Sequence, residues 1–406
     1  MPPPNAFQPS SSPIDKISLD VAASILSQCD TVQEVYPVIQ SHRVFQTAFE
    51  LQTCLILKAV ITAQIPEDLL PFSMTLLSSD DGGWIEFLTA MSRLPSLMAD
   101  KALVDASLSG LPKWHYSGMS KTYAAAKFLA QLMAEEVKPL AAEKFRLGHP
   151  LEKASAVETF RLERAMLRFD LMCSMFCSWD CAWLDHNDPV RHRPIREFFG
   201  SFSPWVNEQM LCAYEFLKKK IRQVLPEIQS DIAALDDRWG PVVFNKFIND
   251  DDYLRHRAVN YVHQIITHGL PLIADLIGPK SNQEKARLFL RQDFSVHFDI
   301  GFYPGPSLSF MTTAYRTAVA GLETTPLRSY SADDWARFTG EFDTKYDSTD
   351  TAAFKVWLFT HRNKYMRGSI LSDTDRNLRC CGYAIWDIPD QINAAAVRAI
   401  RNEPWT

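Results

Sequence analysis

Apolar side chains recur at intervals of three and four residues along most of the chain. The pattern is clear over residues 43–62, returns over 122–145, and is strongest from 151 to about 184. Alternation with a period of two never extends beyond about five residues. Because a helix repeats every 3.6 residues and a strand every two, the pattern predicts an all-α fold with a multi-helix, bundle-like globular body.

Serines mark where several of these helices begin. Ser203 followed by Pro204 fits an N-cap and the first helical position. Ser281 with Glu284 three residues later is the pattern of a capping box. Ser331 precedes a short predicted helix in the same way.

Other boundaries follow from proline and glycine. Pro139 should kink or divide its helix, and Gly269 with Pro271 should break another. The helix that begins after Ser203 should end near Leu225. Two further helices are predicted near the end of the chain, over 352–361 and 390–401.

The organisation along the 406 residues has three parts. Residues 1–13 are rich in proline and serine and poor in apolar side chains, so they are predicted to form a disordered tail. A small helical unit should span 14–65, and a helical body should span 66–406.

Composition excludes several classes of function. The formal net charge is −6, and the longest basic run is Lys218-Lys219-Lys220, which is too short for a nucleic-acid track and should lie on a solvated helix face. Eight cysteines are far too few for a disulfide scaffold of this length. No stretch approaches the ~20 apolar residues of a membrane-spanning helix, so we expect a cytoplasmic or nuclear protein that binds neither nucleic acid nor membrane.

Three cysteines fall four residues apart on the strongest periodic segment, at Cys173, Cys177 and Cys181. On a helix they share a face, which suits a soft metal ion. Cysteine zinc sites usually use loop pairs together with a second pair elsewhere, and none stands out. We therefore expect buried, metal-free thiols. The arginines of the same segment, at 161, 164 and 168, occupy another face of the helix.

Two polar clusters could carry acid–base or metal chemistry. Their candidate residues are Asp180, Asp185, His186, Asp251, His256 and His263. The first cluster matches no motif and also suits a loop. The second has acidic residues before a helix, as in the diphosphate–magnesium sites of isoprenoid enzymes, but it lacks the second magnesium motif. Acidic residues also favour a helix N-terminus, so capping is the simpler reading.

Residues 17–50 resemble an F-box, which is a small helical motif. An Ile-Leu pair in that motif is followed by a short break and a Leu-rich helix that ends in arginine and aromatic residues. Ile25-Leu26 matches the pair, and Arg43 with Phe45 matches the end. Further segments resemble the large group of F-box-like proteins of filamentous fungi, namely 55–60, 164–170, 203–209 and 381–387.

The resemblance implies a docking site for the Skp-type adaptor of the SCF ubiquitin ligase. The adaptor-binding residues it implies are Leu19, Ile25, Leu26, Arg43 and Phe45. The Leu-Pro-x-Glu start of the motif is replaced here by Ser18-Leu19-Asp20-Val21. We therefore expect weak or absent adaptor binding. The apolar residues of the segment should instead form a small helical core that docks on the rest of the chain, made of Leu19, Ile25, Leu26, Phe45 and Phe49.

No complete catalytic motif is present, so the catalytic residues stay unknown and no metal or cofactor is expected. The leading hypothesis is a non-catalytic interaction protein, a diverged F-box-like receptor that holds a protein or small-molecule ligand on its helical body. The alternative is an enzyme of fungal specialised metabolism with its active site in a helical cavity.

Overall fold

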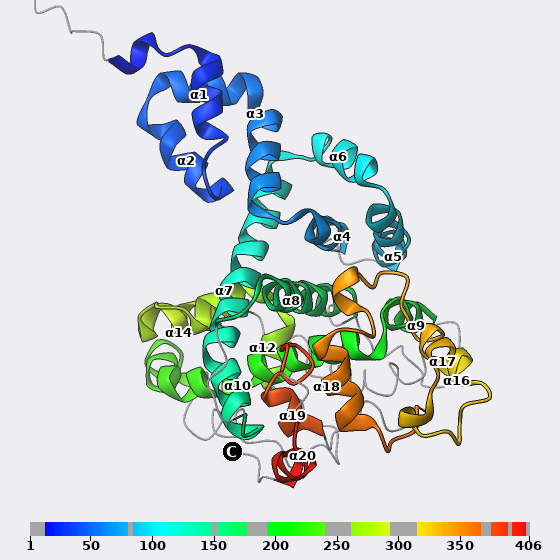
Figure 1. Cartoon of the computed structure of the whole chain (residues 1–406). Coiled ribbons are helices and arrows are strands. Elements are labelled where there is room, and N and C mark those ends of the chain that lie inside the picture. The colour runs from blue at the N-terminus through cyan, green and yellow to red at the C-terminus, as the bar shows by residue number, and fades with distance from the viewer. Residues whose placement is uncertain are drawn as a thin grey trace, which may run out of the picture. The chain divides into compact units, whose positions relative to one another are not determined.

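The computed structural model describes residues 13–79, 84–147, 153–176, 193–239, 261–292, 315–366, 375–388 and 392–402. Regular structure within these ranges is helical, apart from one isolated bridge between Pro326 and Tyr365. The predicted all-α fold is therefore confirmed (Figure 1). The chain divides into two compact units. Unit 1 is residues 1–77 with 96–124, and unit 2 is residues 78–95 with 125–406.

Unit 1 is built around one long helix, α3, against which α1 and α2 both pack (Figure 1). Its elements are η1 (Pro13–Lys16), α1 (Leu19–Leu26), α2 (Val32–Ser41), α3 (Arg43–Gln64), η2 (Glu67–Leu69), most of α4 (Leu70–Ser79), α6 (Lys101–Ser109) and the first part of α7 (Lys113–Lys144). Leu26, Val35 and Phe45 are buried where the first three helices meet.

Side-chain caps explain where α1 and α2 begin. The Ser18 hydroxyl accepts from the Val21 backbone N–H at 3.3 Å, and the Thr31 hydroxyl accepts from Glu34 N–H at 3.3 Å. Each cap satisfies a backbone donor that has no partner inside the helix.

The helix α3 is bent at Gln52, whose backbone leaves the helical region at φ −127° and ψ 26°. The Gln52 side chain donates to the Asp20 carboxylate at 3.1 Å and so links the bend to α1. By length and composition α3 could cross a membrane, with a mean hydropathy of 1.4 over 18 residues. This differs from the expectation that no stretch of the sequence approaches a membrane-spanning helix. Core helices of soluble proteins pass the same test, and α3 buries Phe45, Ile56 and Val60 within the protein.

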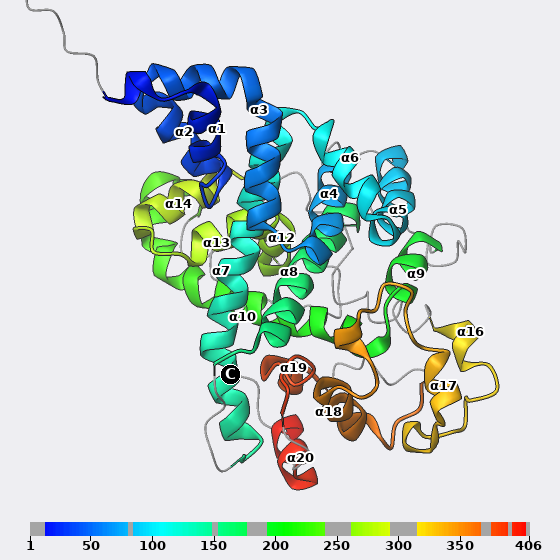
Figure 2. The same ribbon diagram turned by 45° about the horizontal axis from the view of Figure 1, so that its top comes forward.

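Unit 2 is organised around α10, which packs against α8, α14 and α19 (Figure 2). Its elements are most of α5 (Trp84–Ala99), the rest of α7, α8 (Ala156–Phe176), α9 (Arg193–Gly200), α10 (Pro204–Leu235), η4 (Asp237–Trp239), α12 (Tyr261–Thr267), α13 (Leu270–Ile277), α14 (Asn282–Leu290), α16 (Arg316–Val319), η6 (Leu327–Ser329), α17 (Ala332–Ala336), η7 (Lys345–Asp347), α18 (Ala352–His361), α19 (Arg376–Cys380) and α20 (Ala394–Asn402).

Several predicted boundaries are confirmed. The capping boxes at Ser281 and Ser331 both form. In each, the carboxylate of Glu284 or Asp334 accepts a hydrogen bond from the backbone N–H of the capping serine. Gly269 separates α12 from α13. Its backbone φ is +96°, a conformation that residues other than glycine rarely adopt.

Other boundaries were wrong. Pro139 does not divide α7, which also begins nine positions before the predicted Thr122, at Lys113. The helix after Ser203 does not stop near Leu225 but continues to Leu235, through Pro226. Tertiary burial of these helices outweighs the local cost of a proline. The predicted tail before Pro13 lies outside the described residues.

Candidate functional site

The arginine face of α8 is the most distinctive feature of unit 2, because it is buried. Arg161, Arg164 and Arg168 have at most 1% of their surface exposed. Arginine is almost never fully buried unless it is paired. Sequence reasoning placed these arginines on a separate face of the helix but did not find their partners. The helix also carries Glu158, Glu163 and Asp170, so its sequence pattern does not distinguish these buried arginines from a solvated polar face.

Arg164 forms a two-pronged ion pair with Asp347 of η7. Both guanidinium nitrogens lie 2.6 Å from the carboxylate oxygens, and Nη2 also donates to Gln209 at 2.9 Å. Asp347 accepts from the Thr344 backbone N–H and hydroxyl as well. Burial raises the pKa of Asp347, but Arg164 and these hydrogen bonds outweigh it, so the pKa lies below its ordinary value.

Arg161 and Arg168 are held mainly by uncharged oxygens. Arg161 donates to the Tyr346 and Ile385 carbonyls and pairs with Asp387 at 2.7 Å. Arg168 donates to the Val206 carbonyl at 3.1 Å and to Asn207 Oδ1 at 2.6 Å. Its guanidinium also lies 3.6 Å from the centre of the Phe202 ring. Burial and the charge of Arg164 lower the pKa of Arg168 to about 9. The three arginines thus join α8 to α10 and to two later segments.

A second buried cluster joins α18, α19 and α20. The Asp375 carboxylate lies 2.8 Å from Arg401 Nε and 3.2 Å from His361 Nε2, and it contacts Lys364. Burial raises the pKa of Asp375, but the hydrogen bond and electrostatic effect of His361, together with the charges of Lys364 and Arg401, bring it far below the ordinary value. Glu208 and Arg379 form another enclosed pair at 2.6 Å.

One chain of groups in this cluster has the order of a hydrolase triad. The Thr360 hydroxyl lies 2.8 Å from His361 Nδ1, and His361 Nε2 lies 3.2 Å from Asp375. A nucleophile needs access to substrate. All three residues are at most 5% exposed, and Thr360 donates to the Trp357 carbonyl at 2.8 Å. This arrangement is structural.

A loop at 340–343 is held on the junction between α9 and α10. Asp343 accepts from the backbone N–H groups of Ser203 at 3.1 Å and Gly340 at 3.0 Å, and Phe342 N–H donates to the Ser201 carbonyl at 3.1 Å. Gly340 approaches so closely that a Cβ there would lie 2.3 Å from Phe202 Cα. Burial and the charge of Asp347 raise the pKa of Asp343 to about 6. Among the described residues, Asp343 makes no ion pair.

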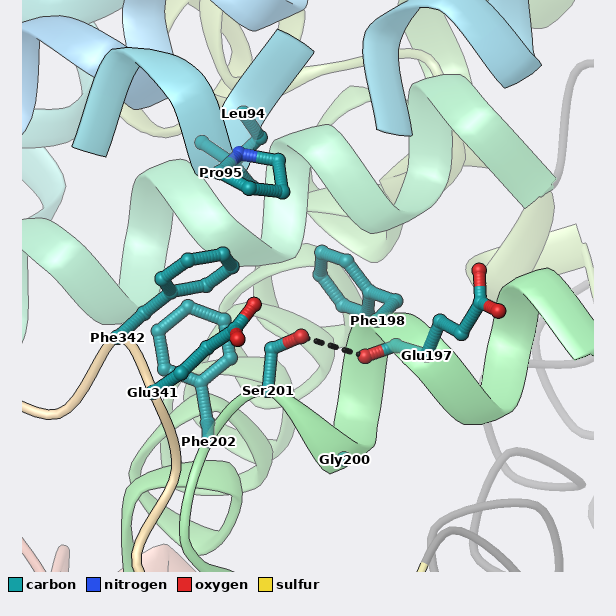
Figure 3. A pocket seen from close by; sticks show the side chains of 9 residues that line it. All are labelled: Leu94, Pro95, Glu197, Phe198, Gly200, Ser201, Phe202, Glu341 and Phe342. Carbon is teal, nitrogen blue, oxygen red and sulfur yellow. Dashed lines mark hydrogen bonds between the residues drawn. The ribbon is translucent and has the colours of Figure 1, made fainter. Parts of the chain in front are cut away.

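That loop forms one wall of a cavity of about 330 Å³ (Figure 3). Leu94 and Pro95 lie opposite, and the rings of Phe198, Phe202 and Phe342 cluster between them. The Ser201 hydroxyl donates to the Glu197 carbonyl at 2.7 Å, and the Glu197 carboxylate points away from the rings (Figure 3). The three rings are between 0% and 8% exposed, so they contribute to the core rather than present a face to a ligand.

A second cavity of about 530 Å³ lies between α7 and the start of α8. This volume is in the range of small-molecule sites. Its wall includes buried Lys138 and Glu163 beside small residues such as Ala130 and Ala134. Lys138 is already engaged by Glu158 at 2.6 Å and by the Lys153 carbonyl at 3.1 Å.

Most of the large apolar side chains exposed among the described residues lie in unit 1, while unit 2 exposes Phe128, Leu235 and Tyr365. Val21 and Ile25 of α1 are 50% and 42% exposed, and Leu51 and Leu55 of α3 are 68% and 67% exposed. Val21 and Ile25 are four residues apart and share a face of α1, whereas the bend at Gln52 lies between Leu51 and Leu55 of α3. The Asp20–Gln52 hydrogen bond lies beside Val21 and Leu51 in sequence and holds these parts of α1 and α3 together. We call these four residues the α1–α3 apolar face.

The five residues implied as adaptor contacts divide between core and surface. Leu26 and Phe45 are buried, as expected. Ile25 is exposed, so the expectation that it lies in the core was wrong. Leu19 is half-buried, and Arg43 is exposed as the first residue of α3.

Most of the predicted polar site lies outside the described residues. This applies to Asp180, Asp185, His186, Asp251 and His256. His263 lies on α12, and its side chain is not described.

The cysteine and lysine predictions have mixed outcomes. Cys173 is buried, as predicted, whereas Cys177 and Cys181 lie outside the described residues. In the described part of the chain, no three His, Cys, Asp or Glu side chains are grouped as metal ligands. Lys218 is buried rather than solvated, with its Nζ 5.9 Å from the centre of the Tyr214 ring.

Comparisons with known proteins give no relative: no family model matches the chain, and neither a curated protein nor a solved structure does.

Proposed function

We propose that this chain is a non-catalytic interaction protein that binds a partner protein through the α1–α3 apolar face of its F-box-like unit. The observation that carries the proposal is the exposure of these four large apolar side chains on two helices that a hydrogen bond links. Contiguous apolar surface on a soluble protein is typical of an interaction site.

The interior of unit 2 supports a scaffold role. Its enclosed carboxylates Asp347, Asp375 and Glu208 are each committed to basic side chains that tie separate segments together. Groups used in this way are not free to act as acid, base or nucleophile. We therefore assign binding to unit 1 and mechanical support to the ion pairs of unit 2.

The Skp-type adaptor is the partner to test, because the resemblance of residues 17–50 to an F-box implies it. The buried positions of Leu26 and Phe45 leave Val21, Ile25, Leu51 and Leu55 as the available apolar contacts. Without the Leu-Pro-x-Glu start, binding through these four residues should be weaker than that of a complete F-box.

Calorimetric titration of the full chain with purified adaptor tests this proposal. We expect saturable binding that Ile25→Asp and Leu55→Asp each weaken at least about tenfold, as charges placed in an apolar contact do. Leu103→Asp is the matched control, since Leu103 is an exposed leucine of α6 in the same unit. Absence of binding, or equal weakening by all three changes, would rule out the adaptor at this face.

One observation favours a second candidate function. The cavity between α7 and α8 has the size of a ligand site and includes the buried charges of Lys138 and Glu163. An enzyme or a small-molecule receptor would use it. Mass spectrometry of small molecules released from the purified chain would support that alternative if one compound were retained by the native protein and lost from an Ala134→Trp variant.

A further inference from the structure

Two hydrogen bonds attach the 340–343 loop to the junction between α9 and α10. The Phe342 N–H donates to the Ser201 carbonyl, and the Ser203 N–H donates to the Asp343 carboxylate, both at 3.1 Å. The second bond depends on the state of a side chain, because a carboxyl group gains or loses a proton with pH. The attachment of the loop is therefore open to control by pH.

Release of this loop would uncover buried aromatic side chains. The ring of Phe342 lies 5.6 Å from the ring of Phe202, and both residues line the cavity of about 330 Å³. Figure 3 shows Phe342 beside Phe202, with Leu94 and Pro95 across the cavity from them. Phe202 is fully buried while the loop is in place. The loop thus covers one side of this cavity.

Four charged or titratable side chains interact electrostatically with Asp343. Asp347 of η7 is a second carboxylate, and it is committed to Arg164 of α8 through two contacts of 2.6 Å. Arg164, Arg168 of α8 and Tyr315, which precedes α16, act on Asp343 as well. None of the described basic side chains forms an ion pair with Asp343, so its negative charge is only partly compensated.

The ionised form of Asp343 is therefore less favourable in the attached loop than in water. Burial and the nearby charge of Asp347 raise the pKa of Asp343 to about 6, although its hydrogen bonds with Ser203 and Gly340 act in the other direction. A carboxylate on a released, hydrated loop has the ordinary pKa of about 3.9. Binding of the proton thus favours attachment of the loop, and loss of the proton favours its release.

We propose that the 340–343 loop is a pH-controlled lid, which closes over the cavity when Asp343 is protonated and opens more often when Asp343 is ionised. Attachment is strongest below about pH 4 and weakens as the pH rises through 6. The two pKa values give a fall of about tenfold in the attachment equilibrium between pH 5 and 7.5. The lid lies in unit 2 and is independent of the α1–α3 apolar face.

Hydrogen–deuterium exchange of the full chain at pH 5 and 7.5 tests this proposal, with each amide rate divided by its intrinsic rate at the same pH. The reporters are the amides of Phe342 and Ser203, which exchange when the loop is released. We expect their protection to fall about tenfold from pH 5 to 7.5. The amide of Phe354, which donates to the neutral Thr351 hydroxyl at 3.3 Å, is the internal control and should keep its protection.

Two variants separate Asp343 from its neighbours. Asp343→Asn keeps an acceptor oxygen but cannot ionise, so the protection of the reporter amides should no longer change with pH. Glu341→Gln is the matched control, since Glu341 is an exposed carboxylate of the same loop, and it should retain the fall. Equal protection at both pH values in the native chain would overturn the proposal, as would the same fall in Asp343→Asn or at the Phe354 amide. The native chain and Glu341→Gln decide the question even if Asp343→Asn does not fold.

Discussion

Arg164 and Asp347 show how strongly single buried charges hold unit 2 together. Removing one partner of an enclosed pair leaves the other charge uncompensated, which costs about 3–5 kcal/mol. We expect Arg164→Met and Asp347→Ala each to lower the free energy of unfolding by about that amount, and the double variant to lose less than the sum. Urea denaturation of the native chain, the two single variants and the double variant measures these losses of unfolding free energy.

The exposed pair Lys101–Glu67 is the control for this prediction. Its side chains are 75% and 58% exposed, and their separation of 2.7 Å resembles that of the buried pair. Lys101→Met should leave stability unchanged, because exposed pairs contribute little. If Arg164→Met were equally harmless, the ion pair would not hold α8 to η7.

Asp343 should make stability depend on pH in the sense opposite to most carboxylates. Its pKa is raised to about 6 in the folded chain, against about 3.9 for an unfolded Asp. The folded state therefore binds the proton more tightly, so the contribution of Asp343 to stability is full below about pH 4 and is lost as pH rises through 6. Asp343→Asn should remove this part of the slope of the melting temperature between about pH 4 and 6.

Asp350 provides the comparison for that measurement, because it is an exposed aspartate of the same region. Asp350→Asn should leave the slope as it is in the native chain. Equal slopes in the native chain and in Asp343→Asn would show that Asp343 does not titrate in this range. Asp375 acts in the other direction: its lowered pKa stabilises the fold at neutral pH, and this stabilisation is lost as pH falls below about 4.

At the scale of helices, α1 presents a buried and an exposed apolar residue side by side. Leu26 is fully buried between α1, α2 and α3, while Ile25 is 42% exposed. Leu26→Ala should therefore cost about 2–5 kcal/mol, as large-to-small core changes do. Ile25→Ala should cost well under half as much, and thermal denaturation of both variants checks the difference. Similar losses would mean that Ile25 packs in the core after all, and the α1–α3 apolar face would shrink to three residues.

The sequence was most informative where a helix boundary depends on residues at the boundary itself. Ser281 with Glu284 and Ser331 with Asp334 make their capping boxes within four positions, so local spacing is enough to predict them. Pro139 does not divide α7, and α10 continues through Pro226 beyond its predicted end, because the packing of these helices compensates for the hydrogen bonds that proline removes.

The buried polar interior could not be predicted in the same way. Arg164 is 183 positions from Asp347, and Glu208 is 171 positions from Arg379. Charged residues at helical spacing look alike whether they face water or distant partners, so only the fold reveals which they do. The α1–α3 apolar face was missed for the same reason: spacing identifies Ile25 and Leu55 as apolar positions but not whether another element covers them.

At the scale of the whole molecule, the account separates binding from support. Unit 1 exposes the α1–α3 apolar face, and unit 2 encloses its ion pairs. A charge placed on that face should weaken partner binding without lowering the stability of the chain, whereas loss of Arg164 should destabilise unit 2. Either effect can be observed without knowing the partner in advance.

The most direct test is affinity capture of the full chain from its native cells, followed by mass spectrometry of bound proteins and small molecules. The native chain is compared with Ile25→Asp/Leu55→Asp and with Leu103→Asp, after melting curves have shown that all three are folded. We predict that a stoichiometric protein partner is retained by the native chain and by Leu103→Asp and is lost from the double variant. Equal retention of every bound protein by the double variant, together with a small molecule that remains bound to all three chains, would contradict the account and favour a ligand site in unit 2.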